Sequence, residues 1–147
     1  MEAKFSQRVK DVISFSREEA LRLGNDFIGV EHLLLGLIRE GDGKAITVLN
    51  EFHLDLKMIR KEIEQNLASS NPGVAKKISN IPLVKQAERV LKLTYLEAKL
   101  YKSPMIGTEH LLLSILKNED NVACSILNKY GVIYENVKDE LESMKDD

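Results

Sequence analysis

Apolar residues return along this chain every three or four positions, the spacing that places side chains on one face of an α-helix. One such face follows a candidate N-cap at Ser6 and stops at Gly24 and Asn25. A second begins near Gly29 and ends at residues 41–43 (GDG). Because no stretch alternates apolar and polar residues long enough for a strand, the pattern predicts helices alone. Two further stretches carry the apolar sets Ala45, Val48, Leu49, Phe52 and Leu56, Ile59, Ile63, Leu67.

The same arrangement occurs a second time. Residues 28–35 (IGVEHLLL) return 78 positions later as residues 106–113 (IGTEHLLL), and the correspondence continues without a gap over 5–64 and 83–142. An ungapped match of this length indicates a tandem duplication. Since each unit predicts four helices, we expect an all-α fold of eight helices, formed by two pseudo-twofold-related four-helix repeats packed into one compact domain.

The predicted domain covers residues 1–147, with repeat one at 5–67, a linker at 68–81 and repeat two at 82–144. The linker is expected because residues 68–73 (ASSNPG) are rich in turn formers. Pro82 then suits the first turn of the next helix. Helices this short persist only when packed against others, so the two halves should pack together.

Composition narrows the class of protein. The 147 residues are 44% hydrophobic and 30% charged, which is typical of a soluble globular domain. The formal net charge of −2 weighs against a nucleic-acid partner, because such proteins carry a basic excess. No apolar run approaches the length needed to cross a membrane, and the N-terminus has no signal-peptide pattern, so we expect a cytoplasmic location.

The repeated segment and its flanks, residues 18–24 (EEALRLG) and 36–43 (GLIREGDG), resemble the Clp N-terminal repeat, most closely that of ClpC-type ATP-dependent protein unfoldases. The resemblance covers nearly the whole chain in both copies. In that family the repeat pair precedes two ATPase modules, whereas this chain has no GxxxxGK[ST] phosphate loop. The chain is therefore expected to be no enzyme and to need no cofactor.

The resemblance implies a docking module for protein quality control and regulated proteolysis. Its expected partners are adaptor proteins and unfolded or marked protein substrates. The ATPase modules of the parent chain and a ClpP-like protease are expected as indirect partners, which receive the proteins that the domain binds.

The resemblance also implies a site at Glu31 and Glu109, in the opening turns of two helices. In ClpC proteins of some bacteria, glutamates at these positions help to recognise phosphoarginine, a degradation mark. A purely structural interpretation is that the helix dipole favours a carboxylate there. Gly29 and Gly107 precede these helices, and we expect them to adopt a positive φ or to allow the close approach of another chain segment.

The match to this site differs between the units. Ser6 corresponds to the hydroxyl residue that the family places at the start of the first helix, but its counterpart Val84 cannot donate a hydrogen bond. Val30 occupies a position where Thr is usual, and Thr108 keeps it. Phosphoarginine binding is accordingly expected chiefly in the first unit.

Phe5 and its counterpart Leu83 precede the first helix of each unit. They are candidates for a hydrophobic staple against the bundle. The alternative is that Phe5 forms one wall of a peptide groove between the units, since peptide-like inhibitors bind the corresponding region of relatives.

A small metal-dependent or hydrolytic enzyme using the Glu-His pairs is the alternative function. The sequence does not favour it, because EHLLL does not present two histidines on one helix face as HExxH does. We expect no metal site, and His32 and His110 partly buried and hydrogen-bonded within their own units. Cys124, which aligns with Ile46, is expected to be a small core side chain.

Overall fold

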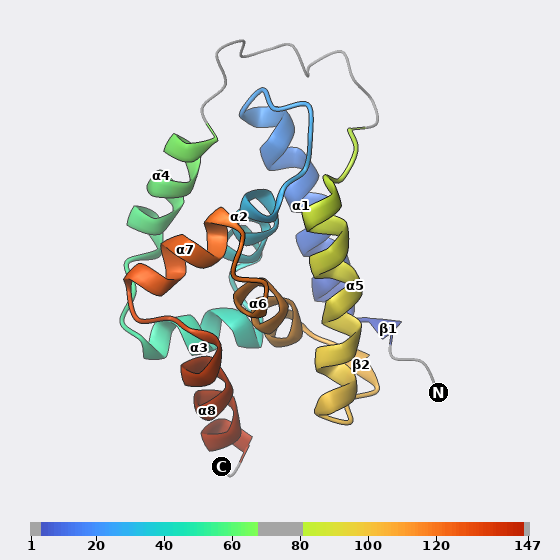
Figure 1. Cartoon of the computed structure of the whole chain (residues 1–147), viewed down its shortest axis with the longest axis vertical. Helices are drawn as coiled ribbons and strands as arrows, with labels where there is room; N and C mark the ends of the chain where they lie inside the picture. The colour runs from blue at the N-terminus through green and yellow to red at the C-terminus, as the bar shows by residue number, and fades with distance from the viewer. Residues whose placement is uncertain (1–3, 68–80, 146–147) are drawn as a thin grey trace.

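The computed structural model describes residues 4–67 and 81–145, which form eight α-helices and two very short strands (Figure 1). The elements of the first unit are β1 (Lys4–Phe5), α1 (Gln7–Arg22), α2 (Val30–Glu40), α3 (Lys44–Glu51) and α4 (Leu56–Asn66). Those of the second are α5 (Lys85–Leu100), β2 (Met105–Ile106), α6 (Thr108–Lys117), α7 (Val122–Lys129) and α8 (Tyr134–Lys145).

The predicted all-α fold is confirmed, and the helices end where local chemistry requires. The side chain of Ser6 accepts from Val9 N at 3.2 Å and caps α1. Gly41 ends α2 in the left-handed conformation, with φ 75°. Residues 68–80 of the expected linker lie outside the described residues. None of the helices within the described ranges is long and apolar enough to cross a membrane.

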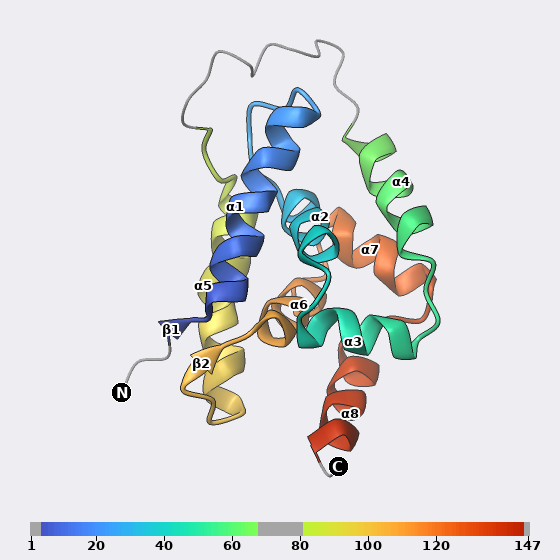
Figure 2. The ribbon, with the colours of Figure 1, turned by 180° about the vertical axis from the view of Figure 1, so that it is seen from behind.

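Helices α2 and α6 form the centre of the molecule, between α1 and α5 on one side and α4 on the other (Figures 1 and 2). Both are apolar around most of their circumference and contribute the bulk of the large side chains that are fully buried. Burial of such side chains is the main favourable term in folding. The duplicated LLL segments therefore belong to one core shared by the two units. Glu31 and Glu109, in the first turns of α2 and α6, remain partly exposed.

Short segments at the start of each unit also pair with the other unit. Phe5 of β1 pairs in parallel with Ile106 of β2, beside the N-terminal end of α1 (Figure 2). The symmetric bridge joins Leu83 with Ile28. Each segment that enters a first helix is thus paired with the loop that enters the second helix of the other unit. The sequence pattern did not indicate these strands, because two residues carry no detectable alternation.

Candidate functional site

The N-termini of α2 and α6 are built in the same way. The backbone nitrogen of Gly29 donates to His32 Nδ1 at 2.8 Å, and that of Gly107 donates to His110 Nδ1 at 2.9 Å. Each histidine thus reaches back to satisfy the start of its own helix. The expectation that both histidines are hydrogen-bonded within their units is confirmed. Both are more deeply buried than expected, since His32 is 0% and His110 4% exposed.

Glu31 and Glu109 curl back over the glycines that begin these helices. A Cβ atom at Gly29 would lie 2.9 Å from Glu31 Oε1, and one at Gly107 would overlap Glu109 Oε1. The φ angles of the two glycines are −102° and −95°, so the backbone is ordinary extended chain. The expected positive φ is therefore wrong, and the atoms that approach these glycines closely belong to nearby residues of the same segment and not to another one. Glycine is needed so that each carboxylate can lie over its helix N-terminus, where the dipole favours it.

The surroundings of the two glutamates differ. Lys44 Nζ of α3 lies 3.9 Å from Glu109 Oε2, and the Glu109 side chain is 17% exposed. The residue that corresponds to Lys44 in the second unit is Val122 of α7. Glu31 therefore has no equivalent cation from that position.

Ser6 of the first unit is bonded through its backbone to the segment that precedes the second unit's glutamate. The backbone nitrogen of Ser6 donates to Ile106 O at 2.9 Å, three residues before Glu109. The symmetric bond, from Val84 N to Ile28 O at 3.0 Å, brings the valine to the segment that precedes Glu31. The segment that leads into the first helix of each unit is thus bonded to the segment that precedes the glutamate of the other unit. The side chain of Ser6 itself accepts from Val9 N of its own helix, and the expectation that the site lies chiefly in the first unit stays a prediction.

Val30 and Thr108 were expected at the ligand, but both are buried. Val30 is 0% exposed and belongs to the hydrophobic core. Thr108 is 2% exposed, and its Oγ1 accepts a hydrogen bond from Ala45 N at 3.1 Å. Val30 therefore packs in the core, and the Thr108 hydroxyl is bonded to the backbone at the start of α3.

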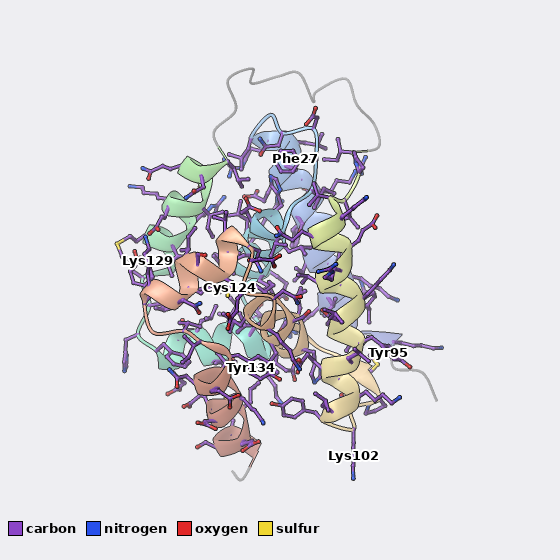
Figure 3. All side chains as sticks on the ribbon, viewed as in Figure 1. Phe27, Tyr95, Lys102, Cys124, Lys129 and Tyr134 are labelled. Carbon is purple, nitrogen blue, oxygen red and sulfur yellow. The ribbon has the colours of Figure 1, made fainter. Side chains whose placement is uncertain are left out.

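A groove of about 730 Å³ lies beside Phe5, between α1, α5 and the paired strands. Its floor is apolar, and Tyr95 projects from α5 beside β2 (Figure 3). Three exposed lysines from three elements surround it, and none makes an ion pair within the described ranges. We call this surface the lysine groove. It is lined by Lys4, Phe5, Lys10, Leu91, Lys92, Tyr95 and Ile106.

A smaller pocket of about 220 Å³ opens beside Glu109. It brings together α3, the loop after α5, the start of α6 and α8. Because it has an anion and a cation at hand as well as hydroxyl and imidazole groups, it suits a ligand with both charges. We call it the Glu109 pocket. Its lining residues are Lys44, Tyr101, Ser103, Glu109, His110 and Leu141.

No group of three or more potential metal ligands occurs in the part of the chain that the structure describes. Cys124 is fully buried on α7, in agreement with its expected role in the core (Figure 3). Lys4, Lys10, Lys44 and Lys92 were missed by sequence reasoning. They are far apart in the sequence, and only the paired strands and the α3–α6 contact bring them to the two surfaces.

Comparisons with known proteins agree with the duplicated architecture. The model of the Clp repeat (R) N-terminal domain matches residues 4–130 and 95–146. The chaperone protein ClpB of Oceanobacillus iheyensis is 38% identical over 133 residues, which are 90% of this chain and 16% of that relative. The negative regulator of genetic competence ClpC/MecB of Bacillus subtilis is 38% identical over 132 residues, with the same two coverages.

Among solved structures, the N-terminal domain of the caseinolytic protease associated chaperone ClpD of Arabidopsis thaliana superposes with a TM-score of 0.71. The alignment covers 94% of each chain at 21% identity, which is a likeness of fold. The chain spans only about a sixth of the length of the curated relatives described above.

Proposed function

The chain belongs to the family of Clp repeat N-terminal domains, and from that premise we propose that it docks adaptor proteins and unfolded or marked substrates for the ATPase modules of a Clp unfoldase. In this proposal the domain catalyses no reaction. The parent unfoldase and a ClpP-like protease act on what it receives. The observation that carries the proposal is the lysine groove.

The chemistry of the groove selects the partner. Its floor is formed by the apolar residues Phe5, Leu91 and Ile106. Binding there becomes more favourable when apolar side chains of a ligand displace water from it. The lysines at its rim attract carboxylates and raise the association rate of acidic segments. The proposed occupant is a peptide segment of an adaptor or substrate in which apolar residues are flanked by Asp or Glu.

Charge reversal tests this proposal. A labelled peptide of alternating Leu and Glu is titrated against the wild type and a Lys4→Glu/Lys10→Glu/Lys92→Glu variant, with Lys57→Glu/Lys61→Glu/Lys99→Glu as the matched control at other exposed positions. We expect the groove variant to lose about tenfold or more in affinity and the control to lose little. Equal losses in both variants, or no binding by the wild type, would contradict docking in the groove.

A second candidate function, recognition of phosphoarginine, is supported by the Glu109 pocket. A phosphorylated guanidinium presents N–H donors beside anionic oxygens. Glu109 supplies the acceptor for the donors, and Lys44 supplies a positive charge for the oxygens. Ser6, joined to Ile106, brings the N-terminus of α1 to the same region.

Calorimetric titration with free phosphoarginine tests this second candidate. The wild type should bind, and the Glu109→Gln and Lys44→Gln variants should each bind more weakly. Arginine and inorganic phosphate alone serve as controls for the two halves of the ligand. Failure of the wild type to bind at millimolar phosphoarginine would end this candidate while leaving peptide docking in the groove unaffected.

A further inference from the structure

Asn25 and Ser103 occupy equivalent places beside the two histidines. The backbone nitrogen of Asn25 donates to Ala20 O at 2.9 Å, and that of Ser103 donates to Ala98 O at the same distance. The chain therefore turns in the same way after α1 and after α5. The side chain at position 103 is therefore attached at the same place relative to His110 as the side chain at position 25 is relative to His32.

The two side chains do different things. Asn25 is 5% exposed, and its Oδ1 lies 2.8 Å from His32 Nε2. Ser103 is shorter, and its hydroxyl donates to Met105 O at 2.6 Å instead. As a result Nε2 of His110 has no hydrogen-bond partner among the residues that the structure describes. His110 is 4% exposed, and it lines the Glu109 pocket.

The hydrogen bonds define what the pocket offers. Since Gly107 N donates to His110 Nδ1, that nitrogen is an acceptor and carries no proton. Burial lowers the pKa of His110, so the ring is neutral and Nε2 carries the N–H. The hydroxyl of Tyr101 is buried and has no hydrogen-bond partner within the described ranges, and its ring centroid lies 5.8 Å from that of His110. This hydroxyl is a buried donor of the kind that is almost always paired in proteins, and the Nε2–H of His110 is a second donor beside the same pocket.

The corresponding place beside His32 and Glu31 lacks these features. Asn25 supplies the partner that His32 needs, and the residues that correspond to Tyr101 and Lys44 are Leu23 and Val122. Neither can donate a hydrogen bond from its side chain or carry a positive charge.

We propose that the two units have diverged, and that the Glu109 pocket holds a bound anionic side-chain group while the corresponding place beside Glu31 does not. His110 Nε2–H and the Tyr101 hydroxyl donate to its oxygens, Lys44 balances their charge, and Glu109 accepts from the cationic part at the mouth. The identity of the ligand, phosphoarginine, rests on the proposed function. The new content is that there is one site per chain, and that the contrast between Asn25 and Ser103 determines which unit has it.

A substitution that gives His110 Nε2 a partner from the protein itself tests the proposal. A Ser103→Asn variant places the carboxamide of the first unit beside His110, and Ser143→Asn is the control at an exposed position of α8. Phosphoarginine is titrated by calorimetry and by NMR of the histidine side chains. The wild type should bind one equivalent and shift His110 but not His32. Ser103→Asn should raise the Tm and weaken binding about tenfold or more, while the control leaves both unchanged.

The outcomes separate this proposal from the proposed function. Two equivalents bound, or wild-type affinity in Ser103→Asn, overturns the single site and leaves phosphoarginine recognition standing. If phosphoarginine does not bind, the proposed phosphoarginine recognition is wrong. A titration with inorganic phosphate then tests whether the pocket binds an anion. A phosphate-dependent shift of the His110 ring that is absent in Ser103→Asn supports the pocket, and no shift overturns it.

Discussion

The hydroxyl of Thr108 accepts a hydrogen bond from the backbone nitrogen of Ala45 at 3.1 Å, so the first residue of α6 caps α3 of the other unit. The N-cap position of α3 is Gly43, which has no side chain of its own to do this. The corresponding residue, Asn121, caps α7 directly, with its Oδ1 2.7 Å from Cys124 N. The first turns of α3 and α7 both need an acceptor for a free backbone N–H group. Another helix supplies it for α3, and the N-cap residue itself supplies it for α7.

Replacing Thr108 by Val should destabilise the domain by about 1 kcal/mol, because the hydroxyl that caps α3 is removed while the shape is kept. Equilibrium unfolding in urea measures this loss. Thr108→Ser retains the hydroxyl and should recover most of the stability, and Thr47→Val controls for the loss of a threonine on an exposed face of α3. Wild-type stability in Thr108→Val would show that the cap contributes nothing. Phosphoarginine affinity should change little, since Thr108 is buried.

Lys102 and His53 have left-handed backbones, with φ 54° and 57°. Their counterparts in the other copy are Gly24 and Gly131, with φ 76° and 82°. A side chain with a Cβ is disfavoured in this conformation, and glycine is not. Lys102→Gly should therefore stabilise the domain by about 0.5 to 1 kcal/mol, as measured by the urea midpoint. Gly131→Ala should act in the opposite direction, and a destabilised Lys102→Gly would contradict the argument.

Helix α1 is tied to α2 and α4 by a buried carboxylate. Glu19 is 2% exposed and lies 3.0 Å from Arg22, 3.2 Å from Arg39 and 3.2 Å from Arg60. Burial opposes the charge of Glu19, but the hydrogen bond from Arg22 and the charges of the arginines hold the pKa of its carboxyl below the usual value. The corresponding Glu97 has Tyr134 at 2.8 Å and Lys117 at 3.3 Å.

Glu19→Gln should cost about 2 kcal/mol, because three guanidinium groups lose a buried partner. The arginines are each at least 35% exposed and can be hydrated, which limits the cost. Glu97→Gln is the matched comparison and should cost less, since Tyr134 can still donate to the amide oxygen. Thermal and urea unfolding of both variants measure the difference. Equal costs would mean that the arginine cluster adds no stability.

The helix boundaries could be predicted because they depend on neighbours in the sequence. Ser6 and Gly41 act within a turn of their own helices, so their residue types are sufficient signals. The link between Ser6 and Ile106 joins distant parts of the chain through a strand too short to show a pattern. For that reason the sequence pattern did not indicate that Ser6 is bonded to the segment that precedes Glu109. The approach of Lys44 to Glu109 depends in the same way on helix packing.

The buried histidines should make the domain lose stability between pH 6.5 and pH 4. Burial lowers the pKa of His32 to about 4 and also lowers that of His110. Above the ordinary histidine pKa of about 6.5, both states are neutral and stability is full. Below it the unfolded chain binds a proton that the folded chain refuses, so the free energy of unfolding falls. For His32 alone the loss at pH 5 is about 2 kcal/mol, and it stops growing once the folded ring is protonated near pH 4.

A His32→Gln variant isolates this effect, because glutamine can accept from Gly29 N and donate to Asn25 without titrating. The free energy of unfolding should fall less from pH 7 to pH 5 in this variant than in the wild type. Carboxyl groups with lowered pKa, such as Glu19, lose their contribution chiefly as the pH falls below the ordinary carboxyl pKa of about 4.5, which is below the pH 5 end of this comparison. His53→Gln, at an exposed position, should keep the wild-type dependence. An unchanged slope in His32→Gln would mean that His32 is not held neutral in the folded state.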